Sequence, residues 1–237
     1  MFVNGTMEER VDVEDWARFR QVDRLADHWD RPDWPPERRY LTWYIVFDSP
    51  ALVDYVKTYQ AQLADLDYLD SIPEDGLHMT VQGIAYVDEL TQEQMTEIAR
   101  RAQGSCSELA PFELRVGPIG GHRGGTFLRT APWEPVVEMR SRVQEAVREV
   151  LGPRDLAEPS AGFKPHISVT YCHSDPPAGD FISRLERLRS DWEPINVPVT
   201  AVSLLEVRRE NRTYRWTERD RIPLSGAPGG GRPGPAG

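Results

Sequence analysis

The chain has 237 residues and a formal net charge of −10, with 39% hydrophobic and 28% charged residues. This composition is typical of a globular protein with a substantial core, and it excludes a peptide-sized or disulfide-stapled scaffold. The negative charge disfavours binding along a long nucleic-acid tract, because every phosphate would meet repulsion. A small nucleotide or one RNA terminus remains a suitable partner, since a local pocket can be positive.

Cysteine usage and hydropathy favour a cytoplasmic protein. Cys106 and Cys172 are the two cysteines, and isolated thiols of this kind form neither a disulfide framework nor a zinc motif. The sequence has no apolar run near the roughly 20 residues that a membrane helix needs, and residues 1–21 lack an apolar signal region. We expect a protein that does not contact membranes, that uses no cofactor and that acts as a monomer.

The two ends of the chain differ in composition from the middle. Apolar residues recur every three or four positions between Trp16 and Trp29, which predicts an amphipathic helix over about 12–29 that packs on the body. A Pro-rich connector follows from Arg31, and the Gly- and Pro-rich stretch 225–237 predicts a disordered tail. The resulting divisions are an extension over 1–39, a body over 40–224 and a tail over 225–237.

Strand and helix signals alternate within the body. β-Branched and aromatic residues indicate strands, and apolar residues at helical spacing indicate helices. The predicted strands are 40–47, 77–86, 112–119, 126–130, 166–171, 197–208 and 213–222, and the predicted helices are 50–66, 91–103, 132–151 and 180–189. The order strand, helix, hairpin occurs twice. This repeat predicts an α+β fold with two lobes, related by a pseudo-two-fold axis, whose antiparallel sheets surround a central cleft.

Each half of the repeat contains a strand in which a hydroxyl side chain follows a histidine by two positions. The pairs are His78 with Thr80 and His166 with Ser168. Because side chains alternate between the faces of a strand, each imidazole is expected on the same face as its hydroxyl, opposite apolar residues that enter the core. The same alternation extends these polar faces to Gln82 and Thr170.

A doubled pair of imidazole and hydroxyl suits acid–base chemistry at a phosphate. Imidazole has an ordinary pKa near 6.5 and exchanges protons readily at neutral pH, while hydroxyl groups donate hydrogen bonds to phosphate oxygens. One neutral imidazole can deprotonate an attacking water or hydroxyl, and a second, protonated imidazole can give its proton to the leaving oxygen. This scheme requires no metal. A single histidine on a strand is more often structural, so the pairing carries the hypothesis.

The sequences His78-Met-Thr-Val and His166-Ile-Ser-Val resemble the paired motifs of the 2H phosphoesterase superfamily, which includes 2′-5′ RNA ligase-like proteins and cyclic nucleotide phosphodiesterases. The context Pro165-His-Ile-Ser is similar to the second motif of the RNA ligase-like branch, where Thr is usual in place of Ser168. The resemblance covers about residues 40–224 and implies a bilobal fold with a V-shaped cleft.

The resemblance also implies an activity and a site. It implies a metal-independent phosphodiesterase of the EC 3.1.4 type, with His78 and His166 as the catalytic acid/base pair and with Thr80 and Ser168 binding the phosphate oxygens of the substrate. The implied substrates are 2′,3′-cyclic phosphates, cyclic ADP-ribose phosphates or 2′-5′ linkages, in small nucleotides or at RNA ends. A role in RNA processing is implied as well. The alternatives are a non-catalytic protein that captures an RNA end or nucleotide in the same cleft, and an interaction scaffold assembled through the N-terminal helix.

Further residues are weaker candidates for the same site, because each also suits a surface or core position. Candidate phosphate or base contacts are Lys164, Arg129 and Arg215, and candidate stacking residues are Trp43, Phe127, Tyr86 and Tyr214. His122 and His173 have no counterpart in the other half. A metal site of His166, His173 and Cys172 lacks zinc-ligand spacing. The predicted turn Gly120-Gly-His-Arg-Gly-Gly lacks the Lys-Ser/Thr of a P-loop.

Overall fold

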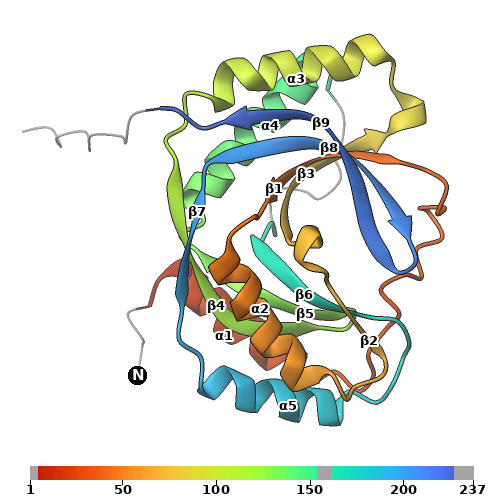
Figure 1. Cartoon of the computed structure of the whole chain (residues 1–237), viewed down its shortest axis with the longest axis vertical. Helices are drawn as coiled ribbons and strands as arrows, with labels where there is room; N and C mark the ends of the chain where they lie inside the picture. The colour runs from red at the N-terminus through yellow and green to blue at the C-terminus, as the bar shows by residue number, and fades with distance from the viewer. Residues whose placement is uncertain (1–4, 154–161, 227–237) are drawn as a thin grey trace, which may run out of the picture.

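Two antiparallel sheets form the centre of the molecule, and helices cover their outer sides (Figure 1). The computed structural model describes residues 5–153 and 162–226. The four-stranded sheet has the order β3-β1-β8-β9, and the five-stranded sheet has the order β2-β6-β5-β4-β7. The predicted α+β architecture with two antiparallel lobes is confirmed.

The helices and strands follow closely the pattern that the sequence predicts for the body. The helices are α1 (Met7–Phe19), α2 (Pro50–Leu63), α3 (Gln92–Cys106), α4 (Glu134–Leu151) and α5 (Gly179–Ser190), with 3-10 turns η1 (Glu74–Gly76) and η2 (Val87–Glu89). The strands are β1 (Tyr40–Val46), β2 (Leu69–Ser71), β3 (His78–Tyr86), β4 (Phe112–His122), β5 (Gly125–Ala131), β6 (His166–Cys172), β7 (Ile195–Val199), β8 (Ala201–Glu210) and β9 (Thr213–Pro223).

The two halves of the sequence repeat exchange their hairpins. Strand β3, which begins at His78, lies in the sheet that contains the hairpin β8–β9 from the second half. Strand β6, which begins at His166, lies in the sheet that contains the hairpin β4–β5 from the first half. Each lobe therefore combines a histidine strand from one half with a hairpin from the other, and β3 and β6 contact each other between the lobes.

The predicted strand 197–208 is two strands that belong to different sheets. Strand β7 pairs with β4 at the edge of the five-stranded sheet, and β8 pairs with β1 and β9 in the four-stranded sheet. Pro198 lies in β7, where the missing N–H is tolerated because an edge strand has only one neighbour. The chain crosses between the lobes at Thr200. The apolar pattern continues through this position, and for that reason the sequence does not predict the change of sheet.

The N-terminal helix is shorter and begins earlier than predicted. Thr6 caps α1 together with Glu9, whose side chain accepts a hydrogen bond from the Thr6 backbone N–H. The helix ends at Phe19, and the predicted helical continuation to Trp29 is wrong. Backbone N–H groups beyond the helix donate to carbonyls of the body instead, for example Leu25 to Pro176. The helix packs against β4, as the apolar stripe predicts.

Two glycines of β4 leave room for aromatic rings to pack against this strand. A Cβ atom on Gly121 would come within 2.3 Å of the Phe19 ring, and one on Gly120 would come within 2.6 Å of the Phe127 ring. Both glycines were predicted in a turn, but they lie in the strand, and Arg123 and Gly124 make the turn. The absence of a Cβ at Gly121 is what allows α1 to dock.

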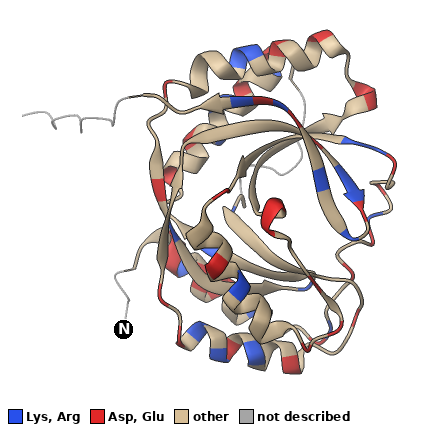
Figure 2. Ribbon diagram, in the orientation of Figure 1, with Lys and Arg blue, Asp and Glu red and all other residues tan. Residues whose placement is uncertain are grey.

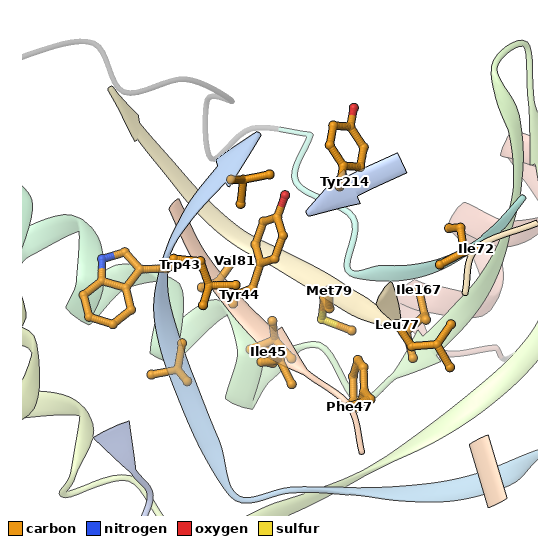
Figure 3. Packing of buried hydrophobic residues seen from close by; sticks show 14 of the residues in the cluster. Trp43, Tyr44, Ile45, Phe47, Ile72, Leu77, Met79, Val81, Ile167 and Tyr214 are labelled. Atoms are coloured by element: carbon orange, nitrogen blue, oxygen red, sulfur yellow. The ribbon is translucent and has the colours of Figure 1, made fainter. Parts of the chain in front are cut away.

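Buried apolar residues from both sheets form one continuous core. Met79 and Ile167, which follow the two histidines, are fully buried and lie near Phe47 and Leu77 (Figure 3). Helices α3 and α4 cover the four-stranded sheet, and α1, α2 and α5 cover the five-stranded sheet. Every helix in the described part of the chain is too short or too polar to cross a lipid bilayer.

The predicted tail begins with two residues that are held by the body. The backbone N–H groups of Ser225 and Gly226 donate to the carbonyl oxygens of Ser107 and Leu109, beyond the end of α3. The rest of the predicted tail, 227–237, lies outside the described residues.

Candidate active site

A cleft with a volume of about 1460 Å³ separates the two sheets and contains both histidine and hydroxyl pairs. His78 and Thr80 enter it from β3, and His166 and Ser168 enter it from β6. Figure 2 shows charged residues mainly on the outer helices and on the β8–β9 hairpin, while β3 and β6 carry none. The four predicted site residues therefore line one cavity.

Each of the two imidazoles is held by the same kind of hydrogen bond. Nδ1 of His78 lies 2.8 Å from the carbonyl oxygen of Gly76, and Nδ1 of His166 lies 2.8 Å from the carbonyl oxygen of Lys164. A carbonyl oxygen only accepts, so each Nδ1 carries a proton and donates it. Nε2 is then the nitrogen of each ring that is suited to exchange a proton with a ligand.

A β-bulge follows the hydroxyl residue in both histidine strands. Between β1 and β3, adjacent residues of β1 pair with Thr80 and Gln82 and leave Val81 as the extra residue. Between β5 and β6, adjacent residues of β5 pair with Ser168 and Thr170 and leave Val169 as the extra residue. A bulge reverses the alternation beyond it, so the cleft is lined further along by Gly83 and Tyr171.

The predicted placement of Gln82 and Thr170 on the histidine faces is therefore wrong. Gln82 is fully buried, and its Oε1 accepts a hydrogen bond of 2.7 Å from Nε2 of Gln144 on α4. The Thr170 hydroxyl lies 3.0 Å from the hydroxyl of Thr126 in the core. Strict two-residue alternation predicts the faces only as far as the bulge.

An aromatic ring from the neighbouring strand flanks each histidine. Tyr44 on β1 stacks on His78, with ring centroids 4.3 Å apart and 10° between the planes. Phe127 on β5 packs edge-on against His166, with ring centroids 5.3 Å apart and 66° between the planes. In the sheet register the two rings are equivalent, because the pairs are Tyr44 with Thr80 and Phe127 with Ser168.

The two imidazoles differ in their exposure. His78 is buried, with 7% of its surface accessible, whereas His166 is exposed in the cleft. Burial lowers the pKa of His78 to about 4, and the hydrogen bond to Gly76 opposes this effect. At pH 7 the His78 imidazole is therefore neutral.

Lys164 and Arg129 line the cleft beside His166, but both are paired with carboxylates of α1. Nζ of Lys164 lies 2.7 Å from Asp15, and the Arg129 guanidinium lies 2.7 Å from Asp15 and 3.1 Å from Asp12. Arg129 is also the register partner of His166 across β5 and β6. Sequence reasoning places these cations near the site and does not predict their acidic partners.

The other candidates divide between the cleft and the rest of the molecule. Phe127, Tyr86 and Tyr214 line the cleft. Trp43 is fully buried in the core, and Arg215 forms an ion pair with Asp75 at the surface.

Two histidines that sequence reasoning left without a role also line the cleft. His28 stacks on Tyr171 at 3.9 Å, and its Nε2 lies 2.8 Å from the hydroxyl of Tyr214. Nδ1 of His122 accepts a hydrogen bond from the Gly124 N–H, so its Nε2 is the donor. Burial lowers the pKa of both. No local motif identifies them, because His28 reaches the cleft from the segment after α1 and His122 is the last residue of β4.

Across residues 5–153 and 162–226, no group of three or more His, Cys, Asp or Glu side chains is arranged to hold a metal ion. Two residues of the metal site considered above have other partners. Nδ1 of His173 lies 3.1 Å from Oδ2 of Asp70, and the Cys172 thiol donates a hydrogen bond to the carbonyl of Ser174.

Comparisons with known proteins identify the fold and the family. A family model described as the 2′-5′ RNA ligase superfamily matches residues 48–211. TT0787 of Thermus thermophilus is 16% identical with a TM-score of 0.64, over 79% of this chain and 98% of that chain. E. coli LigT in complex with NADP+ is 15% identical with a TM-score of 0.57, over 80% of this chain and 99% of that chain. LigT in complex with 3′-AMP is 18% identical with a TM-score of 0.59, over 80% of this chain and 99% of that chain.

No curated protein matches the chain, and the solved structures, at this identity, show a shared fold. The family match extends over more than half of the chain and includes both histidine strands. The chain therefore belongs to the 2′-5′ RNA ligase superfamily of 2H phosphoesterases.

Proposed function

We propose that this protein is a metal-independent phosphoesterase that opens 2′,3′-cyclic phosphates or cleaves 2′-5′ linkages, in small nucleotides or at RNA ends. The observation that carries the proposal is the duplicated arrangement of the cleft. Two imidazoles, each held through Nδ1 by the carbonyl two positions earlier, share one cavity with two hydroxyls. We expect the protein to act as a monomer in the cytoplasm.

The two histidines take different roles in the proposed reaction. His78 is neutral at pH 7, because burial lowers its pKa, and its Nε2 removes a proton from the attacking water. The water oxygen bonds to phosphorus as the bond from phosphorus to one ribose oxygen breaks. His166, protonated on both nitrogens, gives its Nε2 proton to that ribose oxygen, and the product is a phosphomonoester. Thr80 and Ser168 donate hydrogen bonds to the other phosphate oxygens.

The volume of the cleft leaves room for substrates larger than one nucleotide. Sites for small molecules usually have about 300–1,000 Å³, and this cleft has about 1460 Å³. Tyr86 and Tyr214 also line it. LigT has been solved with 3′-AMP and with NADP+, and ligands of both sizes fit the proposal.

The test is turnover of nucleoside 2′,3′-cyclic phosphates and of a 2′-5′-linked dinucleotide in the presence of EDTA, followed by chromatography of the products. Wild type is expected to turn over at least one of them, and His78→Ala and His166→Ala are expected to lose nearly all activity. His173→Ala is the matched control, because that histidine is hydrogen-bonded to Asp70. Full activity in either cleft variant would overturn the assignment. Binding of the substrate by wild type without product would favour a non-catalytic RNA-end or nucleotide binder.

A further inference from the structure

Helix α1 brings two carboxylates to the cations that flank His166. Asp15 accepts hydrogen bonds from Lys164 and Arg129, and Asp12 accepts from Arg129 and, at 2.6 Å, from Arg189. The side chains of Asp12 and Asp15 are only 16% and 17% exposed. Charges at this depth are poorly screened by salt, so they contribute to the electrostatic potential in the cleft.

These charged groups lie close to the proposed reaction centre. The carbonyl oxygen of Lys164 accepts the hydrogen bond from Nδ1 of His166, and Arg129 lies opposite His166 in the sheet register. Asp15, Lys164 and Arg129 all line the same cleft as His166. A phosphate between the two histidines therefore experiences both the cations and the carboxylate that offsets them.

The carboxylate of Asp15 is ionised at neutral pH. Burial alone would raise its pKa, but hydrogen bonds from Lys164, Arg18 and Arg129 lower the pKa to about 2. Arg18, an ion-pair partner of Asp15 on α1, is largely exposed and also lines the cleft. Asp15 is therefore a permanent negative charge beside the site.

We propose that Asp15 is a specificity residue that makes the cleft favour a singly charged phosphodiester over a doubly charged phosphomonoester. Asp15 lies outside the matched family segment 48–211, so this device belongs to the N-terminal extension. The inference rests on the proposed function, in which the substrate is a diester and the product a monoester. Coulomb energy is proportional to the charge of the ligand, so Asp15 opposes a dianion twice as strongly as a monoanion. The same preference promotes release of the product.

Equilibrium binding of two ligands that differ by one charge tests this inference. The probes are adenosine 3′-monophosphate, with about two negative charges at pH 8, and its methyl ester, with one. Calorimetry at low salt compares wild type with Asp15→Asn, which keeps the shape and removes the charge. We expect Asp15→Asn to tighten binding of the ester by about 3-fold and binding of the monophosphate by about 10-fold. Twice the ligand charge doubles the Coulomb energy, and doubling the energy squares the factor in affinity.

Three further variants isolate the effect of the Asp15 charge. Lys164→Gln removes a positive charge instead of a negative one. It is therefore expected to weaken binding of the monophosphate more than binding of the ester. Glu14→Gln removes a carboxylate from an exposed position of α1, where its side chain is 66% exposed, and is expected to change either affinity by less than about 2-fold because solvent screens that charge. Asp15→Glu keeps the charge and is expected to retain the preference of wild type.

The outcomes separate this inference from the proposed function. Equal changes for the two ligands in Asp15→Asn, or weaker binding of the monophosphate, overturn the role of Asp15 even when wild type is an active enzyme. A wild type that binds both ligands but turns over no diester overturns the proposed function and leaves the charge preference to be judged on binding. A wild type that binds neither ligand overturns the charge preference, and turnover of the diesters decides the proposed function separately. If Asp15→Asn does not fold, the response of Lys164→Gln decides.

Discussion

Val81 and Val169 occupy the same position in the two halves of the protein, each as the extra residue of a β-bulge directly after the hydroxyl residue of a histidine strand. Both valines are fully buried. The bulges end the polar face after the hydroxyl and turn the following side chain away from the cleft. The site is therefore limited in each strand to one imidazole and one hydroxyl before the bulge.

The bulge in β3 makes Gln82 a structural residue. Gln144 donates its Nε2 hydrogen bond to Gln82 inside the lobe. We expect Gln144→Ala to lower the free energy of unfolding by about 1–2 kcal/mol, the usual cost of losing a buried hydrogen bond, and to leave kcat/KM within about 2-fold. Urea unfolding and the cyclic phosphate assay measure the two quantities. A large loss of kcat/KM at unchanged stability would contradict this and show that Gln82 contributes to the active site.

The buried His78 makes stability depend on pH. Its pKa is lowered from 6.5 to about 4 in the folded protein, so between these values the unfolded chain binds a proton that the folded protein does not. The free energy of unfolding is expected to fall as the pH falls from about 6.5 to 4, by about 3 kcal/mol from this residue at roughly 1.4 kcal/mol per pKa unit. His28 and His122 act in the same direction.

Urea unfolding at pH 7 and at pH 4.5 measures this dependence. His78→Gln has no titratable group at that position, so its loss of stability over the same interval is expected to be smaller than that of wild type. Identical losses in the two proteins would show that His78 does not titrate differently on unfolding.

The Tyr44 ring lies over the His78 imidazole and keeps water from that face. We expect Tyr44→Ala to raise the pKa of His78 toward 6.5 by hydrating the ring, and Tyr44→Phe to change it little because the ring remains. The NMR titration of the His78 ring protons reports the pKa directly. An unchanged titration in Tyr44→Ala would assign the low pKa to other neighbours.

Substitutions at Thr80 can distinguish the role of its hydroxyl from that of its methyl group. The side chain is only half-buried in the cleft, so either group can be changed with little effect on packing. Thr80→Val removes the hydroxyl and keeps the shape, and we expect it to lower kcat/KM by roughly 100-fold, as for other donors to a developing negative charge. Thr80→Ser keeps the hydroxyl and is expected to stay within a few-fold of wild type. Steady-state kinetics on a cyclic phosphate distinguish the two. Equal losses would assign Thr80 a packing role only.

Docking of α1 depends on the contact between Phe19 and Gly121. A side chain at Gly121 has no room, since a Cβ atom there would lie 2.3 Å from the Phe19 ring. We expect Gly121→Val to displace α1 and make it accessible to limited proteolysis. Gly104→Val is the control, because a Cβ atom on Gly104 of α3 meets nothing within 4 Å. Equal protection of α1 in the two variants would show that the helix docks through other contacts.

The amino-acid sequence by itself determined the features that depend on neighbours along the chain. The spacing of apolar residues predicts the helices and strands of the body, and the two His-x-hydroxyl pairs at corresponding places in a repeat predict the paired imidazoles of the cleft. These features are readable because side-chain periodicity and strand propensity act over a few residues. The early start of α1 also has a local cause, the capping pair of Thr6 and Glu9.

Tertiary structure decided the features that depend on residues far apart in sequence. Pairing between strands determines which sheet each hairpin joins and where the bulges turn Gln82 and Thr170 away. The contact between Asp15 and Lys164 spans 149 positions, and no local pattern predicts it. His28 likewise reaches the cleft because the segment after α1 packs on the body, where the His28 N–H donates to the carbonyl of Cys172. Long-range packing assembles these groups because burial rewards complementary surfaces regardless of their separation along the chain.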